Sequence, residues 1–223
     1  GELKRAEGED AGRSYAVNLG TLRIKTESGK DNYRLKLVGT PLFTINRRVL
    51  AVKAHDVQIE YGETYLDKLR WEIVEGSLAT RFNDTLEIEL GLNKPYAGYG
   101  LYDIVEKSRV LTNESNYTYT FMPGKLDVKR IKLIIIVNED TLYKTYGEAN
   151  EEITFTTNLG YVPYTGNLYR EPGENVRKYQ VFDDRLDFGI NYDVEYKTVY
   201  FTILPRKISV RADNKTKMYG ETD

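Results

Sequence analysis

The acidic pairs of this chain are the residues whose types and spacing could most readily do chemistry. Glu87 lies two residues before Glu89, and Asp183 is adjacent to Asp184. A glycosidase uses two carboxylates, and it holds them facing one another across a cleft. The repeats of this chain are only about 80 residues long, which leaves little room for such a cleft. We therefore interpret these carboxylates as solvated strand and turn positions.

Metal and nucleophile chemistry is restricted by composition. The chain has no cysteine and one histidine, His55, which lies beside Asp56. The missing cysteines exclude disulfides, thiolate catalysis and cysteine-ligated zinc, and a single histidine excludes a multi-histidine metal site. The oxygen-rich loops "NED" at 138–140 and "DNYR" at 31–34 lack the spacing and glycine of an EF-hand. The sequence thus predicts no enzyme, no cofactor and no metal site.

Two tyrosines are the strongest candidates for ligand contact. The stretch "LGLNKPYAGYGLY" at 90–102 places Tyr96 and Tyr99 beside glycines in an expected loop. Exposed aromatic rings can stack on the apolar faces of sugar rings. The alternative is that both rings pack on a neighbouring strand. Tyr102 has counterparts elsewhere in the chain, so we expect a structural role for it.

Charge and hydropathy exclude two further partners. The 223 residues include 32 basic and 34 acidic side chains, spread along the chain, for a formal charge of −2. Nucleic-acid binding would require a basic face, so it is not expected. No apolar run approaches the roughly 18 residues of a membrane span. No targeting or anchoring signal is visible, so an exported protein would contain this chain as a piece.

One tripeptide recurs three times, at spacings of 85 and 73 residues. The copies are Tyr61-Gly62-Glu63, Tyr146-Gly147-Glu148 and Tyr219-Gly220-Glu221. A catalytic motif is needed once, whereas a motif that belongs to a building block is needed once per block. We expect each copy to form a turn in which glycine permits positive φ and glutamate accepts backbone N–H groups. The tyrosine ring would plug the end of a core.

Other marks recur in the same order and divide the chain. An Asn-Tyr pair precedes each tripeptide by 28 to 30 residues, and a basic dipeptide lies between them. The predicted parts are the C-terminal part of a repeat (1–48), a complete repeat with a longer loop (49–130), a second complete repeat (131–207) and the first strand of a further repeat (208–223).

The repeats have the pattern of β-strands. "TLEIEL" at 85–90 and "NYTYTF" at 116–121 alternate apolar and polar residues, and turn-forming residues cluster between such runs. "YLDKLRWEIV" at 65–74 could form a short helix, but its alternation favours a strand. The chain is therefore predicted to be all-β.

The apolar alternation changes parity at each basic dipeptide. Even-numbered Leu126 and Val128 precede Lys129-Arg130, whereas odd-numbered Leu133 and Ile135 follow it. A change of parity moves the apolar set to the opposite face of a strand. We infer that the last strand of each repeat continues directly into the first strand of the next. So short a linker leaves little room for hinge motion, which predicts an elongated, stiff rod.

The order of these motifs resembles the MBG-domain repeats of the YGX type, which occur in tandem in large bacterial surface and adhesin-like proteins. The resemblance covers essentially the whole chain and is clearest at Tyr146 to Glu148, at 166–179 and at Asn191-Tyr192. The loop at 90–102 departs from the pattern. The resemblance implies an extracellular, cell-surface or secreted β-rich module without catalytic residues. An immunoglobulin-like sandwich is the preferred topology, and a β-grasp-like unit is the alternative.

These patterns favour a non-enzymatic stalk. The repeats would act as a stiff spacer in adhesion, with adjacent repeats of the same chain as their partners. The alternative is a ligand-binding module in which the repeats themselves bind a host glycan or surface protein.

Overall fold

The protein is built from strands. A computed structural model describes residues 1–24 and 32–223, and Asp31 of the "DNYR" loop lies outside these residues. The described residues contain no α-helix, only short 3-10 turns between strands. The predicted all-β class is confirmed. Among these residues no helix is long and apolar enough to cross a membrane.

The chain forms two compact units, residues 1–129 and residues 130–223. The finer four-part division stays a prediction. The described residues of the first unit form ten strands: β1 (Lys4–Arg5), β2 (Arg13–Asn18), β3 (Leu42–Ile45), β4 (Arg48–Ala54), β5 (Val57–Glu60), β6 (Trp71–Gly76), β7 (Leu86–Leu92), β8 (Gly100–Leu111), β9 (Tyr117–Met122) and β10 (Gly124–Lys129). They form three sheets, of order β1-β2-β3, β6-β4-β9 and β5-β10-β8-β7.

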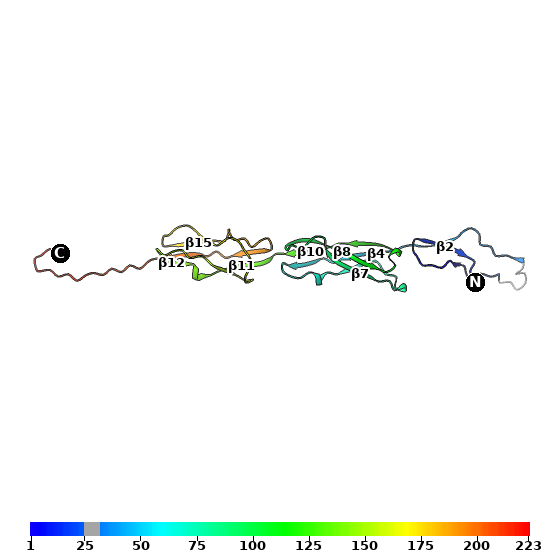
Figure 1. The fold of residues 1–223 in the computed structure, drawn as a ribbon, viewed down its shortest axis with the longest axis horizontal. Helices are drawn as coiled ribbons and strands as arrows, with labels where there is room; N and C mark the ends of the chain where they lie inside the picture. The colour runs from blue at the N-terminus through cyan, green and yellow to red at the C-terminus, as the bar shows by residue number, and fades with distance from the viewer. Residues whose placement is uncertain (25–31) are drawn as a thin grey trace. The chain divides into compact units, whose positions relative to one another are not determined.

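The second unit holds seven strands in two sheets. They are β11 (Ile131–Val137), β12 (Tyr143–Thr145), β13 (Phe155–Thr157), β14 (Tyr169–Arg170), β15 (Lys178–Phe182), β16 (Tyr192–Tyr196) and β17 (Tyr200–Leu204). The sheet orders are β13-β11-β16 and β12-β17-β15-β14. Figure 1 labels β11, β12 and β15 of this unit.

The two units contain the same seven-strand arrangement. When β4 to β10 are matched in sequence with β11 to β17, both sheet orders coincide strand for strand. The orientations agree as well: β4 is parallel to β9 as β11 is to β16, and β5 is parallel to β10 as β12 is to β17. The short sheet β1-β2-β3 has the order of β7-β8-β10.

Each seven-strand set buries a core to which both of its sheets contribute. In the first unit, Leu50 and Val52 of β4 pack with Leu86 of β7 and Leu111 of β8. In the second unit, Leu133 and Ile135 of β11 lie in one cluster, and a neighbouring cluster is built around β15 and β17. Burial follows the period of two that a strand with one buried face requires.

The buried parity changes between β10 and β11. Leu126 and Val128 are fully buried in β10, and Leu133 is fully buried in β11. Only Arg130 separates the two strands. Each strand therefore presents to its own core the face that its sequence parity predicts.

Two expected strands are not formed. The Asn-Tyr segment at 32–38 and the segment at 205–223 contain no strand, and Tyr33, Ile208 and Val210 are exposed. In the first unit the counterpart of 32–38 is β9 and the counterpart of 208–212 is β4, and these two strands pair with each other. Each segment therefore needs such a partner before it can form a strand. The stretch at 65–74 also differs from expectation. It begins with a 3-10 turn at Leu66–Lys68, and its strand starts only at Trp71.

Candidate functional site

The three Tyr-Gly-Glu copies form the same turn. The glutamate N–H donates to the carbonyl three residues earlier, at 3.1 Å in the first copy, 3.0 Å in the second and 3.2 Å in the third. The glycine φ angles are 93° at Gly62, 84° at Gly147 and 92° at Gly220. Positive φ at the third position is the requirement of a type II β-turn, which glycine meets without strain.

The glutamate side chain closes each turn a second time. Glu63 accepts the N–H of Glu60 at 3.3 Å, and Glu148 accepts the N–H of Thr145 at 2.7 Å. Glu221 accepts the N–H of Met218 at 2.9 Å in the same way. The pKa of the Glu63 carboxyl is lowered, chiefly by its hydrogen bond with Lys68. A carboxylate that accepts backbone N–H groups here stabilises the turn locally, even in the strandless segment at 205–223.

The backbone of the motif tyrosine also hydrogen-bonds to the neighbouring parallel strand in each seven-strand set. The Tyr61 N–H donates to the Lys129 carbonyl at 2.9 Å, and the Tyr146 N–H donates to the Leu204 carbonyl at 2.8 Å. The rings vary more than the backbone does. Tyr61 packs against the core, but Tyr146 is 49% exposed and Tyr219 is fully exposed. A plugging ring is therefore present only in the first copy.

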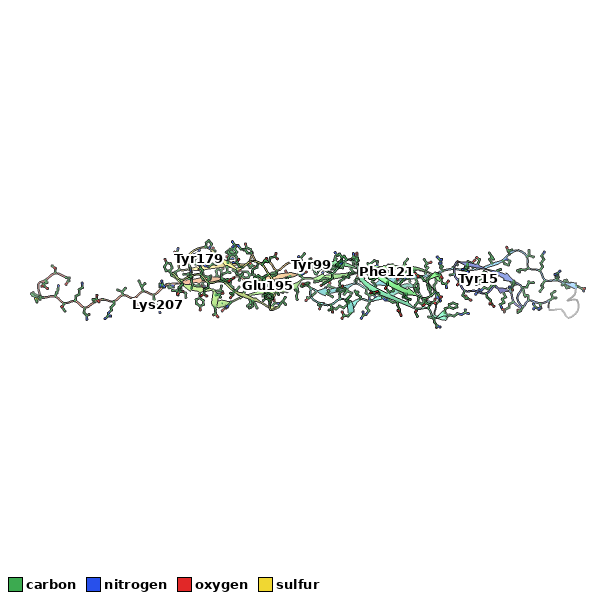
Figure 2. All side chains as sticks on the ribbon, viewed as in Figure 1. Tyr15, Tyr99, Phe121, Tyr179, Glu195 and Lys207 are labelled. Atoms are coloured by element: carbon green, nitrogen blue, oxygen red, sulfur yellow. The ribbon has the colours of Figure 1, made fainter. Side chains whose placement is uncertain are left out.

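A second recurrent feature is a tyrosine whose hydroxyl holds the preceding loop. The Tyr15 hydroxyl donates to the Asp10 carbonyl, and the Tyr102 hydroxyl donates to the Gly98 carbonyl. The Tyr179 hydroxyl donates to the Asn175 carbonyl at 2.7 Å. Tyr15 and Tyr179 are labelled in Figure 2. These contacts give the three aligned tyrosines a structural role.

An arginine supports this loop in two of the three places. The Arg5 and Arg170 guanidinium groups lie 5.2 Å and 4.8 Å from the ring centroids of Tyr15 and Tyr179. Each also donates to backbone carbonyls of its loop and to a glutamate four residues later. The sequence contains a signal for this feature, "R-x-x-G-E" at 5–9 and 170–174. The glycine and glutamate of this signal belong to a Gly-Glu…Tyr pattern that recurs at 8–15 and 173–179, whereas the role of the arginine is seen only in the structure.

A buried lysine links the Tyr-Gly-Glu strand of the second unit to the same loop. Lys144 is 6% exposed, and its ammonium donates to the Glu148 carbonyl at 3.1 Å and to the Glu174 carboxylate. Arg170 and Asn150 donate to the other oxygen of Glu174. The Lys144 hydrogen bond is the largest cause that lowers the pKa of Glu174 to about 2. The ionised carboxylate therefore acts as a structural acceptor for this lysine.

Tyr96 lies inside a cluster of tyrosines. Its ring centroid is 5.3 Å from that of Tyr65 and 5.7 Å from that of Tyr102, and it hydrogen-bonds the backbone of Gly62. Burial, followed by the neighbouring tyrosines, raises the pKa of its hydroxyl. Tyr99 is 40% exposed on the same loop. The loop at 93–99, between β7 and β8, thus packs over the first Tyr-Gly-Glu turn.

A second aromatic surface lies in the second unit, at a place that no sequence motif indicated. Phe155, Tyr161 and Tyr164 line an open cleft of about 320 Å³. Tyr164 packs against Phe155 at 4.9 Å and against Phe188 at 5.6 Å, whereas Tyr161 is 87% exposed. A fixed ring beside an exposed ring is an arrangement on which a sugar or an aromatic side chain can stack.

Two acidic residues of the first unit accept structural hydrogen bonds. Glu89 accepts the Ser108 hydroxyl at 2.8 Å, on the outer face of a strand pair. The buried Asp84 accepts hydrogen bonds from Asn113 and from the Tyr117 hydroxyl. His55 lies 3.5 Å from Glu72 at the surface. Within the described residues, no three or more histidine or acidic side chains form a group that could hold a metal ion.

Neither a protein-family model nor a curated protein nor a solved structure matches the chain.

Proposed function

We propose that the chain is a non-enzymatic repeat segment of a bacterial cell-surface protein and that it acts as a stiff spacer in adhesion. The repeats would be tandem β-sandwich modules, each with its own core. The proposed partners are adjacent repeats of the same chain. The resemblance to MBG-domain repeats supports an extracellular location.

One observation carries this proposal: the same seven-strand order is built twice in succession. β4 to β10 and β11 to β17 agree in sheet order and in the direction of each parallel pair. Repeats that follow one another along the chain and contact only their neighbours build extended, quasi-one-dimensional proteins. Side-chain contacts support the same interpretation, because the recurrent groups hold turns and loops together.

The short connection between strands supports stiffness. β10 ends at Lys129 and β11 begins at Ile131, so one residue joins a strand of one core to a strand of the next. A connection of this length has few free dihedral angles, whereas a flexible linker needs many residues.

Small-angle X-ray scattering tests the proposal. A compact 223-residue protein has a radius of gyration of about 17 Å, whereas end-to-end modules would give about 30 Å. We expect the larger value. A radius near 17 Å would exclude a rod and, with it, the spacer function.

A ligand-binding module is the second candidate, favoured by the cleft of Phe155, Tyr161 and Tyr164. The exposed Tyr161 ring offers a stacking surface, and the exposed Thr156 lines the same cleft and offers a hydroxyl for hydrogen bonding. A host glycan is the ligand class that fits these groups. Tyr96 and Tyr99 remain the candidates that the sequence indicated.

A glycan array separates these sites. Specific binding that is lost in Tyr161→Ala but kept in a Tyr96→Ala/Tyr99→Ala double variant would assign recognition to the cleft. The reverse result would assign recognition to the loop at 93–99. Absence of binding by the unaltered chain would leave no support for this second candidate.

A further inference from the structure

The outer face of one sheet in the second unit carries aromatic side chains. In β17, Tyr200 is 52% exposed, whereas the alternate residues Phe201 and Ile203 are buried. In β12, Tyr143 is 57% exposed and the adjacent Lys144 is buried. Lys144 lies opposite Ile203, so these two residues share the inner face. Because successive side chains of a strand point to opposite faces, Tyr143 and Tyr200 both lie on the outer face of the sheet β12-β17-β15-β14.

The strand register arranges four rings in an oblique row across this face. Tyr169 of β14 lies directly opposite Phe182 of β15, and their ring centroids are 5.4 Å apart. Phe182 and Tyr143 are the diagonal neighbours of Tyr200 on its two sides. Diagonal neighbours lie about 7–8 Å apart, so this aromatic row, Tyr143, Tyr200, Phe182 and Tyr169, crosses all four strands over roughly 20 Å.

One end of the aromatic row is held in place. The Arg185 guanidinium lies 3.8 Å from the centroid of the Tyr169 ring. The Tyr169 hydroxyl hydrogen-bonds with the Asp184 carboxylate, and this bond is the largest cause that raises the pKa of Tyr169. Tyr169 in turn packs against Phe182. Rings that are ordered before a ligand arrives lose little conformational freedom on binding.

Polar side chains lie between the rings on the same face. Gln180 lies opposite Tyr200, and Thr202 lies opposite both Tyr143 and Lys178. Lys178 is exposed, and among the described residues its ammonium forms no ion pair. The face thus offers an amide, a hydroxyl and a cation beside the rings. The core of a protein–protein interface is depleted of lysine, so this mixture better fits a ligand whose own apolar and polar groups alternate.

The aromatic row is a feature of the second unit and not of the repeated framework. The two strand sets are matched on their recurrent tyrosines, Tyr61 with Tyr146 and Tyr102 with Tyr179. The counterparts of the four rings in the first unit are not aromatic: they are Gln58, Lys125, Val105 and Gly91. A feature that stabilises every repeat recurs with it, as the Tyr-Gly-Glu turn does, whereas a binding site needs to occur only once.

We propose that the aromatic row binds a linear acidic polysaccharide, with sugar rings along the row and a carboxylate paired with Lys178. The flat apolar face of a sugar ring can stack on an exposed aromatic ring, as a nucleic-acid base does. Its hydroxyl groups find hydrogen-bond partners in Gln180 and Thr202. A row favours a linear ligand, because a compact one would contact only one or two of the rings. The exposed ammonium favours an acidic ligand by charge complementarity.

This site is separate from the cleft of Phe155, Tyr161 and Tyr164. The strand that contributes Phe155 to the cleft, β13, belongs to the sheet β13-β11-β16, whereas the aromatic row lies on the other sheet of the unit. The site is also independent of the spacer function. Its failure would leave that function untouched, because small-angle scattering tests the spacer without any ligand.

Nitrogen–proton NMR of the whole chain, titrated with hexasaccharides up to about 10 mM, tests the proposal. The probes are hexasaccharides of hyaluronan, of galacturonate and of mannuronate, with neutral cellohexaose for comparison. We expect at least one acidic probe to shift the amide signals of β15 and β17 and to saturate. It should bind at least about tenfold more tightly than cellohexaose, because only an acidic probe pairs with Lys178. Raising the salt from about 50 mM to about 500 mM should reduce this difference.

Two pairs of variants locate the site. Tyr200→Ala should raise the dissociation constant at least about tenfold, because it removes a ring from the middle of the row. Tyr161→Ala is its matched control: it removes an exposed tyrosine of the same unit that lies in the cleft, so binding should be unchanged. Lys178→Gln should lower the affinity for the acidic probe to that of cellohexaose. Lys132→Gln, a change on the other sheet, should not.

Three results would overturn the proposal: no acidic probe shifts the spectrum, Tyr200→Ala binds as tightly as Tyr161→Ala, or cellohexaose binds as tightly as the acidic probes. The NMR spectrum of each variant also shows whether the unit is folded, so a loss of binding is not confused with unfolding. A polyproline peptide is the probe for a protein ligand, because proline-rich helices dock on aromatic side chains. Binding of this peptide alone would replace the polysaccharide by a protein partner.

Discussion

At the scale of single residues, glycine recurs in the three Tyr-Gly-Glu turns for one physical reason. Gly62 has a φ of 93°, and a Cβ built there would meet no atom within 4 Å. The positive φ of the backbone, and not a lack of space for a side chain, therefore requires glycine at this position. A residue with a Cβ in this region loses about 1–2 kcal/mol.

The change Gly62→Ala should lower the free energy of unfolding of the first unit by about 1–2 kcal/mol. Urea titration followed by fluorescence measures it, because Trp71, the only tryptophan, lies in β6 of that unit. Gly220→Ala is the control: its φ is 92°, but it lies in the strandless segment, so this transition should not move. Equal unfolding midpoints for Gly62→Ala and the unaltered chain would contradict the strain argument.

The Lys144–Glu174 pair makes the second unit sensitive to acid. Folding lowers the pKa of Glu174 from 4.5 to about 2, so its contribution to stability is fully present above pH 4.5. It is lost as pH falls toward 2, where the carboxylate is protonated in the folded state as well. Carbon NMR of the Glu174 carboxyl should give an apparent pKa near 2.

Lys144→Met should raise the measured pKa of Glu174 toward 4.5, because Lys144 is the largest cause of the shift. In Glu174→Gln, the acid-dependent loss of stability of this unit should shrink. Lys132→Met, which removes an exposed lysine paired with Glu195, serves as the control and should leave the Glu174 titration unchanged. A Glu174 pKa that does not respond to Lys144→Met would refute the assignment.

At this scale the sequence predicted part of the site. The threefold Tyr-Gly-Glu indicated a turn with glycine at positive φ and a glutamate that accepts backbone hydrogens. The sequence could not show that Lys144 is buried, because nothing in the residues around a lysine in so short a strand distinguishes a buried side chain from a solvated one. Its burial depends on Glu174, which lies 30 residues away in sequence.

At the scale of elements, alternation predicted strands well where both partners are present. Leu86, Ile88 and Leu90 all lie in β7. Alternation alone failed at 32–38 and 208–212, because the backbone groups of a strand need a neighbour. Sheet order was not predictable either. The parallel pairing of β5 with β10 joins segments about 70 residues apart, and no local pattern specifies it.

The core of the second unit depends on which face of β11 is buried. Leu133→Ala removes a side chain that is 0% exposed, and it should lower the free energy of unfolding by about 2–5 kcal/mol. Ile136→Ala lies in the same strand, where the side chain is 51% exposed, so the change should stay within about 0.5 kcal/mol. Thermal unfolding of residues 130–223 in the whole chain, followed by NMR, compares them. Similar losses for both variants would mean that the odd-numbered face is not the buried one.

At the scale of the whole molecule, two features of the chain combine. The strand set β4 to β10 is repeated as β11 to β17, and the buried parity changes across one intervening residue. The parity of the apolar residues in the sequence indicated the second feature, whereas the division of the chain into repeats stays a prediction. Whether the two units keep one mutual orientation depends on how freely Arg130 and its neighbours rotate.

Insertion of six Gly and Ser residues between Lys129 and Arg130 tests that freedom. If the native connection is stiff, residual dipolar couplings of residues 49–129 and 130–204 should fit one alignment tensor in the unaltered chain. The insertion adds many rotatable bonds, so the two sets should then require separate tensors of different magnitude. A conservative Lys129→Arg change should retain the single tensor. Separate tensors already in the unaltered chain would mean that the connection is a hinge, and a stiff spacer could not be built from it.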